Sequence, residues 1–297
     1  MNGRESKESA AVPEEEFRRH EALLDSVPYF DVELSGRCNL RCAFCPRDGI
    51  ARPMDLMADD TLDFLTGWIP PGARVMLSGL GEPLLHPRAV DFVGRLKAGG
   101  RTAGVTTNAT LLTEETLTAL VSAGLDILEV SVPTLDPELH RRMMPGADPG
   151  AVLANLRFLR KIRPQSLRVY LAVVLQAENR PGLKELKAFA REQGFTVFKR
   201  ALHSRGGALY EPRRKPAANG CGIFAKVTFV ASTGEILACC NDVSGSTRLG
   251  TVRELSFEDL RGRKRELIRR GARFAPCRAC DDPTRRVLLE GKTGPGA

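Results

Sequence analysis

Three cysteines in one short stretch constrain this chain more than any other feature. Cys38, Cys42 and Cys45 come just after an apolar run at residues 29–34 that is typical of a strand. Thiolates are the soft ligands that hold iron–sulfur clusters, and a cubane [4Fe–4S] cluster normally takes four of them. A cluster bound by this loop would therefore keep one iron free of protein, able to chelate a substrate or cofactor as an open zinc position does in a catalytic site.

A zinc site or a chance grouping of buried thiols is the alternative interpretation of the loop. Zinc sites usually pair two C-x2-C units or add histidines, and this loop does neither. The spacing, with Phe44 directly before the third cysteine, resembles the signature of the radical S-adenosylmethionine (radical SAM) superfamily. The resemblance implies that the open iron binds the amino and carboxylate groups of S-adenosylmethionine. One electron would then cleave this cofactor to a 5′-deoxyadenosyl radical.

The composition limits the other possibilities. The chain has 297 residues, 42% of them hydrophobic and 27% charged, which suits one large domain or a barrel with an appendage. No apolar run approaches the ~20 residues of a membrane-spanning helix, and residues 1–16 contain no hydrophobic signal segment. We therefore expect a cytoplasmic location, where the eight cysteines favour metal ligands or catalytic thiols over disulfides.

The net charge of +8 is concentrated late in the chain. The basic residues form two groups, one at 213–215 and one comprising Arg261, Arg263, Lys264, Arg265, Arg269, Arg270 and Arg273. A solvated helix face is the ordinary interpretation, and attraction for an anionic substrate or nucleic acid is the alternative. Almost no aromatic residues lie among these arginines, which disfavours a base-stacking surface for nucleic acid. We expect no membrane partner.

Strand-like and helix-like segments alternate from residue 31 onward, after a disordered start at 1–13 and a short helix at 14–25. Strands are expected at 75–77, 103–106, 127–132, 167–175 and 195–198, and helices at 88–97, 113–124, 151–162 and 183–193. With the first strand these make six β/α units, which predict parallel strands with right-handed helical crossovers. The pattern matches the partial (β/α)6 TIM-like barrel of the radical SAM family, whose chemistry gathers at the carboxyl ends of the strands.

The turn after the second strand resembles the family's G-x-G-E-P motif. Gly79, Gly81 and Glu82 occupy its conserved positions, and the resemblance implies that they hold the amino group of S-adenosylmethionine. Glycine lets the backbone approach a ligand closely, and a glutamate can accept hydrogen bonds from an ammonium.

Three polar residues follow later strands. Asn108 lies in a turn that resembles the family's T-N-G turn, with Ala109 in place of the usual glycine. Ser131 corresponds to a serine that commonly faces the cofactor, and Asn179 is a candidate for binding its nucleoside part. For Asn108, Ser131 and Asn179, ordinary turn capping is an equal alternative. His203 lies near the expected substrate mouth and is a candidate site residue, whereas we expect His20, His86 and His140 to be structural.

A second group of cysteines lies beyond residue 220. Cys221 and Cys239 flank a segment that reads as a β-hairpin with its turn at 232–235, and Cys277 and Cys280 form a C-x2-C unit. Together these four thiolates could hold zinc or a second [4Fe–4S] cluster. The arrangement resembles the shortened SPASM, or "twitch", extension behind some radical SAM barrels, which implies one auxiliary [4Fe–4S] cluster.

Cys240 is left over from this set. Beside a ligand and near the substrate mouth, it could donate a hydrogen atom to a substrate radical, and it is the candidate catalytic residue. It could instead be a spare ligand or a buried filler.

The predicted architecture is an N-terminal disordered or helical segment (1–28), the partial barrel (29–205), a β-hairpin plus helix extension for the auxiliary cluster (206–285) and a flexible tail (286–297). The resemblance implies hydrogen abstraction from a small polar substrate, a sugar or aminocyclitol natural product, giving oxidation or epimerisation. A flavodoxin or ferredoxin would supply electrons. The alternatives are ribosomal-peptide maturation, action on a nucleoside or nucleic acid, and a non-catalytic iron–sulfur carrier or zinc-stabilised binding module.

Overall fold

The computed structural model describes residues 12–212 and 220–291. The predicted disorder at 1–13 and the basic run at 213–215 fall largely outside these residues. So does the end of the predicted tail, although its first residues continue the helix α10, Thr284–Val287. Among the described residues, no helix combines the length and apolar character that crossing a bilayer requires.

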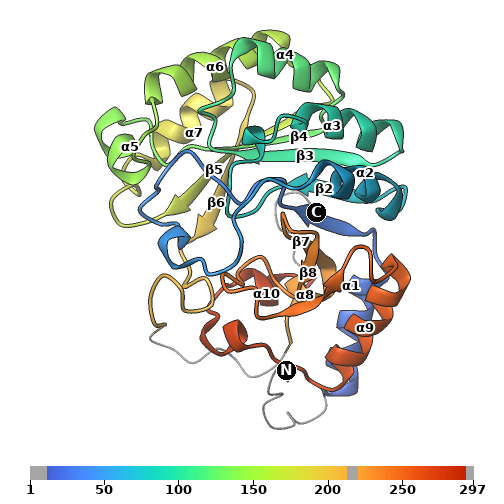
Figure 1. Cartoon of the computed structure of the whole chain (residues 1–297). Coiled ribbons are helices and arrows are strands. Elements are labelled where there is room, and N and C mark those ends of the chain that lie inside the picture. The colour runs from blue at the N-terminus through green and yellow to red at the C-terminus, as the bar shows by residue number, and fades with distance from the viewer. Residues whose placement is uncertain (1–11, 213–219, 292–297) are drawn as a thin grey trace.

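Six parallel strands form the barrel wall in the order β6-β5-β4-β3-β2-β1 (Figure 1). Their bounds are β1 Tyr29–Val32, β2 Arg74–Leu77, β3 Thr102–Thr107, β4 Ile127–Ser131, β5 Arg168–Leu175 and β6 Thr196–Ala201. The helices between them are α2 Asp59–Trp68, α3 Ala89–Ala98, α4 Glu114–Ser122, α5 Pro137–Met143, α6 Pro149–Ile162 and α7 Leu183–Glu192. The expected partial (β/α)6 barrel is thus confirmed.

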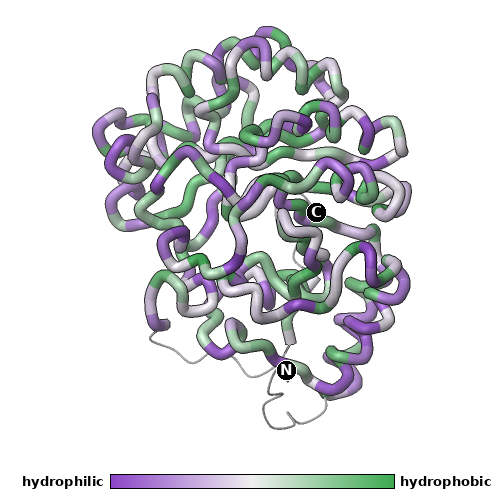
Figure 2. Tube along the Cα trace, in the orientation of Figure 1, coloured by the Kyte–Doolittle hydropathy of each residue, from purple (hydrophilic) through white to green (hydrophobic). Residues whose placement is uncertain are grey.

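Alternation along the strands separates an apolar outer face from a polar inner face. In β1, Phe30 and Val32 are fully buried under the helices, whereas Tyr29 and Asp31 on the other face are half-buried. Burial of the outer-face side chains stabilises the barrel by about 1.5–3 kcal/mol for each large aliphatic or aromatic residue. Figure 2 shows hydrophobic residues along the central strands and many hydrophilic residues on the surrounding helices. The inner face is therefore free to carry polar groups.

The C-terminal part continues the same sheet instead of forming a separate one. Strand β7, Val227–Val230, pairs in parallel with β1, and β8, Glu235–Leu237, and β9, Arg248–Thr251, follow in antiparallel order. Gly234 has φ +78° at the turn between β7 and β8, a conformation that glycine adopts without strain. The predicted β-hairpin is confirmed. Helices α8, Gly222–Lys226, and α9, Phe257–Arg269, complete this part.

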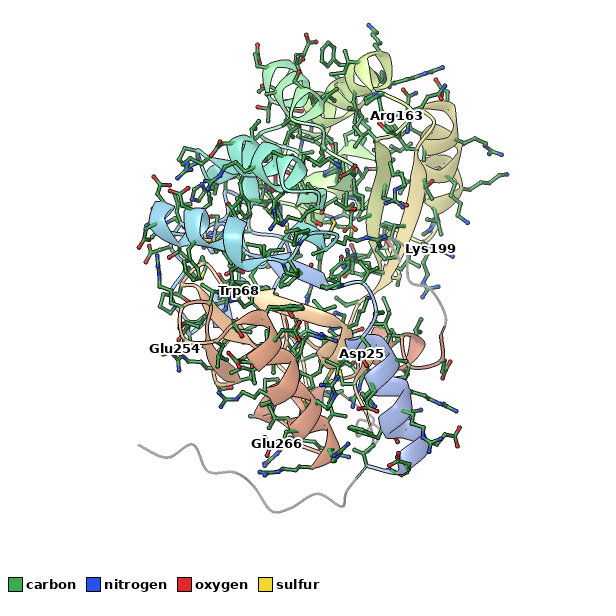
Figure 3. All side chains as sticks on the ribbon, turned by 90° about the vertical axis from the view of Figure 1, so that its right-hand side faces the viewer. Asp25, Trp68, Arg163, Lys199, Glu254 and Glu266 are labelled. Atoms are coloured by element: carbon green, nitrogen blue, oxygen red, sulfur yellow. The ribbon has the colours of Figure 1, made fainter. Side chains whose placement is uncertain are left out.

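The N-terminal helix α1, Glu14–Leu24, lies beside α9 far along the chain (Figure 3). Asp25, just past the end of α1, forms ion pairs with Arg261 at 2.5 Å and Arg265 at 2.9 Å. The guanidinium of Arg269 lies 4.6 Å from the ring centroid of Phe17. One face of the arginine-rich helix α9 therefore makes contacts within the chain. These basic residues were expected from the sequence to face solvent.

Two helices of the barrel, α2 and α5, were not expected from the sequence. The helix α2 has no side-chain cap at Ala58 and includes Gly67, so its local preference for helix is weak. It forms because Leu62 and Leu65 are fully buried against the barrel. The seven-residue α5 is too short to show a helical period, and it starts from the Asp136 cap with Pro137 in its first turn.

Candidate active site

The first three cysteines lie on the loop that follows β1. The backbone N–H of Cys45 donates to the carbonyl of Cys42 at 3.1 Å, and Arg47 donates to the carbonyls of Cys38 and Leu40. Leu40 packs with Met144 and Ala147 beyond α5, and the side chains of Cys38, Cys42 and Phe44 pack against this small apolar cluster. The loop is thus held in place by one neighbouring segment while its thiols stay half-buried.

Burial governs the acidity of these thiols. It raises the pKa of Cys42 to about 12, and the neighbouring Cys45 and Cys38 raise it further. Burial also raises the pKa of Cys45, although Arg47 and Arg205 oppose this. Crowded thiols of this kind stay protonated until a metal replaces their protons, so the donor set fits a thiolate-bound cluster.

The G-x-G-E turn is clamped against the start of the cysteine loop. A Cβ atom on Gly81 would collide with the carbonyl oxygens of Ser35 and Arg37, so only glycine fits there. The N–H of Glu82 donates to the carbonyl of Arg37 at 2.8 Å. A Cβ atom on Gly79 would collide with the Glu33 side chain, which forms a buried ion pair with Arg52 at 2.5 Å.

Glu82 connects this turn to the turn after β3. Its side chain is 1% exposed and accepts from the Thr107 hydroxyl at 2.7 Å, the Asn108 N–H at 2.8 Å and the Leu84 N–H at 3.2 Å. Burial raises the pKa of Glu82, and these bonds oppose the rise. The Glu82 carboxylate thus holds the turns after β2 and β3 together. Its contact with the amino group of the cofactor stays a prediction.

Asn108 contacts the cysteine loop directly. Its amide donates to the thiol of Cys38 at 3.6 Å and to Asn39 at 2.9 Å. The next residue, Ala109, has φ +66°, which explains why related turns have glycine at this position.

Ser131 and Asn179 differ in their surroundings. Ser131 ends β4 on the inner face, half-buried. Asn179 is buried; its amide donates to the carbonyls of Pro133 at 3.1 Å and Val174 at 2.9 Å, and its oxygen accepts from the N–H of Gln176. Through these bonds Asn179 fixes the conformation of two loops, as turn capping predicts. Its contact with the nucleoside part of the cofactor stays a prediction.

The four cysteines of the second group line one cavity of about 230 Å³, with Phe224 and Ile268 among its apolar walls. A single water needs only about 10–15 Å³ of such volume, so the space exceeds what one ion requires. In the described part of the chain, no three His, Cys, Asp or Glu side chains converge closely enough to hold one metal ion. The cavity fits a cluster of several atoms better than a single zinc.

Cys221 and Cys239 lie half-buried in this cavity wall. Burial raises the pKa of Cys221 to about 12, and contact with the thiol of Cys240 raises the pKa of Cys239 well above its usual range. His20 accepts from the N–H of Cys221 at 3.1 Å, consistent with the structural role expected for this histidine.

Cys240 does not line the cavity. Its side chain packs against Phe229, Ala231 and Leu237. Phe229 pairs with Asp31 across β7 and β1, so this thiol lies on the side of the sheet that carries the barrel interior.

The barrel interior contains a charged group that sequence reasoning missed. The Ser78 hydroxyl donates to Asp31 at 2.8 Å, and Arg200 forms an ion pair with Glu129 across β6 and β4. Burial raises the pKa of Asp31 to about 6, and the hydrogen bond from Ser78 opposes this. The alternation of Tyr29, Asp31 and Glu33 with apolar neighbours was the signal that could have found this residue.

Residues after β6 connect the two cysteine sites. Arg205 donates to the side-chain oxygen of Asn241 at 2.9 Å, next to Cys240. Its charge also offsets part of the rise that burial causes in the pKa of Cys45. The imidazole of His203 lies 3.6 Å from Asp282, close to Cys280. His203 thus contacts the cysteine-bearing extension, and its place near a substrate mouth stays a prediction, whereas His86 and His140 bond to backbone groups.

A partial β/α barrel with three thiols after its first strand and a four-cysteine extension defines an iron–sulfur enzyme that generates radicals. The chain belongs to the radical SAM superfamily: the family's model matches residues 32–190, and the model of the SPASM iron–sulfur cluster-binding domain matches residues 221–281. The class implies a [4Fe–4S] cluster with S-adenosylmethionine, and the extension implies an auxiliary iron–sulfur cluster.

Among curated relatives, GTP 3′,8-cyclase of Limosilactobacillus fermentum is 29% identical over 188 residues, 61% of this chain and 55% of that protein. The chain thus spans about half the length of the curated relatives that it matches. The fold resembles BtrN in complex with AdoMet and 2-DOIA, at TM-score 0.59 and 19% identity over 86% of this chain and 94% of BtrN. It also resembles Streptococcus suis SuiB bound to its precursor peptide SuiA, at TM-score 0.62 and 18% identity over 97% of this chain and 74% of SuiB.

Proposed function

We propose that this radical SAM enzyme abstracts hydrogen from a small hydroxyl-bearing substrate, a sugar or aminocyclitol, and oxidises it to a carbonyl compound. The observation that carries the proposal is the polar inner face of the barrel between the two cysteine sites. When bound, the first cluster and S-adenosylmethionine supply the abstracting radical, and the auxiliary cluster supplies a one-electron acceptor. The first cluster would be held by Cys38, Cys42 and Cys45, and the second by Cys221, Cys239, Cys277 and Cys280.

Asp31 is the proposed general base for this oxidation. Removing hydrogen from an alcohol carbon and then one electron leaves a hydroxyl proton that a base must accept. The carboxylate of Asp31 is oriented by Ser78 at 2.8 Å, and its pKa of about 6 is close to that of an efficient base at neutral pH.

The Glu129–Arg200 pair would orient the polar groups of the substrate. Arg200 has 46% of its side-chain area exposed although it projects from the inner face of β6, so part of it remains open to a ligand. Cofactor contacts remain proposed for Phe44, Gly79, Gly81, Glu82, Asn108, Ser131 and Asn179.

The first experiment is anaerobic reconstitution. Two [4Fe–4S] clusters should give ~8 iron atoms per chain, against ~4 if the second site holds zinc. With S-adenosylmethionine and dithionite, which replaces the proposed flavodoxin or ferredoxin, the protein should form 5′-deoxyadenosine. A fully reconstituted protein that formed none would contradict the proposal.

Incubation with a panel of aminocyclitols and sugars then tests the reaction. A substrate should increase 5′-deoxyadenosine formation and yield a carbonyl product. Asp31→Asn should lower product formation by about 10²–10⁴-fold while cleavage of S-adenosylmethionine continues, because only the proton acceptor is lost. Equal product yields from the two proteins would exclude Asp31 as the base.

Epimerisation is the second candidate, and the position of Cys240 on the inner side of the sheet favours it. A thiol that returned hydrogen from the opposite face would place solvent deuterium in the product. Cys240→Ala would then stop turnover, whereas an oxidation would not require this thiol.

Cyclisation of GTP must also be tested because curated relatives are GTP 3′,8-cyclases. A triphosphate needs several available cations; on the inner side Arg52 is buried in its pair with Glu33, and Arg200 is only partly open beside Glu129. We therefore expect no cyclised product from GTP under conditions that cleave S-adenosylmethionine.

A further inference from the structure

Lys264 is an isolated buried cation behind the auxiliary cavity. It lies in the middle of α9 and is 2% exposed. Its ammonium donates to the carbonyl of Val227 at 2.8 Å and to the hydroxyl of Thr228 at 3.2 Å, and it lies 5.7 Å from the ring centroid of Phe224. All three partners are neutral, and no ion pair found at residues 12–212 and 220–291 includes this amine.

A buried charge without an opposite charge is unfavourable, because the low dielectric disfavours the ionised form. Other basic residues of the same helix differ in this respect: Arg261 and Arg265 pair with Asp25. Burial lowers the pKa of Lys264 to about 7, and the one group that opposes this is Cys221. Cys221 is one of the proposed cluster ligands, so the thiolates of a bound cluster would supply the opposite charge.

The local structure fixes the distance between the amine and that site. Cys221 directly precedes α8, and Phe224 lies within this helix with its ring centroid 5.7 Å from the ammonium. Phe224 and Ile268, one turn beyond Lys264 on α9, both line the cavity. Lys264 is therefore separated from the cavity by a single layer of side chains.

We propose that Lys264, together with the cavity-lining Arg285, is a counter-charge of the auxiliary cluster and raises its reduction potential, which favours transfer of an electron from the substrate. This inference rests on the proposed function, in which the second site holds an iron–sulfur cluster. Four thiolates outweigh the positive charge of the [4Fe–4S] core, and one added electron increases the net negative charge. A fixed positive charge nearby stabilises the reduced state more than the oxidised state.

The test is a redox titration of the reconstituted holoprotein, followed by electron paramagnetic resonance. The auxiliary signal is the one that S-adenosylmethionine does not perturb. Lys264→Met should lower the midpoint potential of this cluster by at least about 59 mV. For one electron this equals a tenfold change in the equilibrium constant for reduction. Arg263→Met, which removes an exposed charge from the same helix, should leave the midpoint unchanged.

The cluster-free protein provides a second measurement. Lys264→Met should be as stable as the parent chain in urea or more stable, because an unpaired buried charge is lost. A purely structural lysine would instead destabilise the cluster-free protein when replaced and leave the potential unchanged.

The outcomes separate the two proposals. About 8 iron atoms per chain with equal midpoints in the parent and Lys264→Met would overturn the role of Lys264 alone. About 4 iron atoms with zinc in the second site would overturn the auxiliary cluster, and the inference with it.

Discussion

At the scale of single residues, Gly81 shows how a missing side chain positions a site. Gly81→Ala should lower iron incorporation at the first loop and weaken binding of S-adenosylmethionine, because a Cβ atom would displace the carbonyls of Ser35 and Arg37. Iron analysis and equilibrium dialysis measure both effects. Gly67→Ala, at an exposed position of α2 with free space around it, should instead stabilise the protein by about 1 kcal/mol.

The stability of the protein should depend on pH through the buried carboxyl group of Asp31. Its folded-state pKa of about 6 lies above the ordinary value of 3.8, so the folded state binds more protons between these pH values. The contribution of Asp31 to the free energy of unfolding therefore falls as pH rises through that window. Asp31→Asn should match the parent near pH 4 and exceed its stability by about 1–3 kcal/mol above pH 6 in urea denaturation.

Asp63 provides the control with opposite sign. Arg88 and Arg95 hold its pKa at about 2, below the ordinary value. Asp63→Asn should therefore lose stability at neutral pH, and the loss should disappear as pH falls toward 2. The same direction of change in both variants would show that burial of Asp31 is not the cause of its effect.

At the scale of elements, an aromatic group joins the barrel to the C-terminal extension. The rings of Phe30 on β1, Trp68 on α2 and Phe257 on α9 pack at centroid distances of 5.2–6.1 Å. The indole N–H of Trp68 donates to the carbonyl of Leu255 at 2.7 Å, and Figure 3 labels this residue near the junction with α9. The two parts consequently share one apolar core.

Trp68→Phe should reduce the free energy of unfolding by about 1–3 kcal/mol, because it removes this hydrogen bond and part of the ring packing. Chemical denaturation followed by circular dichroism measures the loss. Phe64→Leu on the same helix should cost less than about 1 kcal/mol, since Phe64 is exposed and the guanidinium of Arg253 lies 4.8 Å from its ring centroid. Equal losses in the two variants would contradict a special role for the junction.

At the scale of the whole molecule, one continuous sheet supports both cysteine sites. Strand β1 pairs with β2 on one side and with β7 on the other, so the loop after β1 and the hairpin before Cys239 are fixed relative to each other. The division at residues 205 and 206 remains a proposal. The helix α1 packs on α8 and α9, and so contacts the extension.

Neighbouring cysteines test the site assignment across this framework. Cys239→Ala should lower the iron content from ~8 toward ~4 atoms per chain, because it removes a thiol that lines the auxiliary cavity. Cys240→Ala should keep the full content, since this thiol packs on Phe229 outside the cavity. Loss of iron in both variants, measured after identical reconstitution, would make Cys240 a ligand as well.

The sequence by itself determined the class of protein and most of the barrel. Ligand chemistry fixes the spacing of Cys38, Cys42 and Cys45, and strand and helix periods are local properties that the chain displays residue by residue. The hairpin turn at Gly234 is equally local, because its backbone conformation requires glycine.

Only the tertiary structure showed the surroundings of Asp31, Lys264 and Cys240, from which their proposed roles are argued. Each depends on contacts between residues far apart in the chain: Asp31 with Ser78, Lys264 with Val227, and Cys240 with Phe229. Burial and charge arise from such packing, and they change the pKa of a carboxyl or an amine in ways that no local pattern encodes. For the same reason α2 was visible only once the barrel that buries Leu62 and Leu65 was in place.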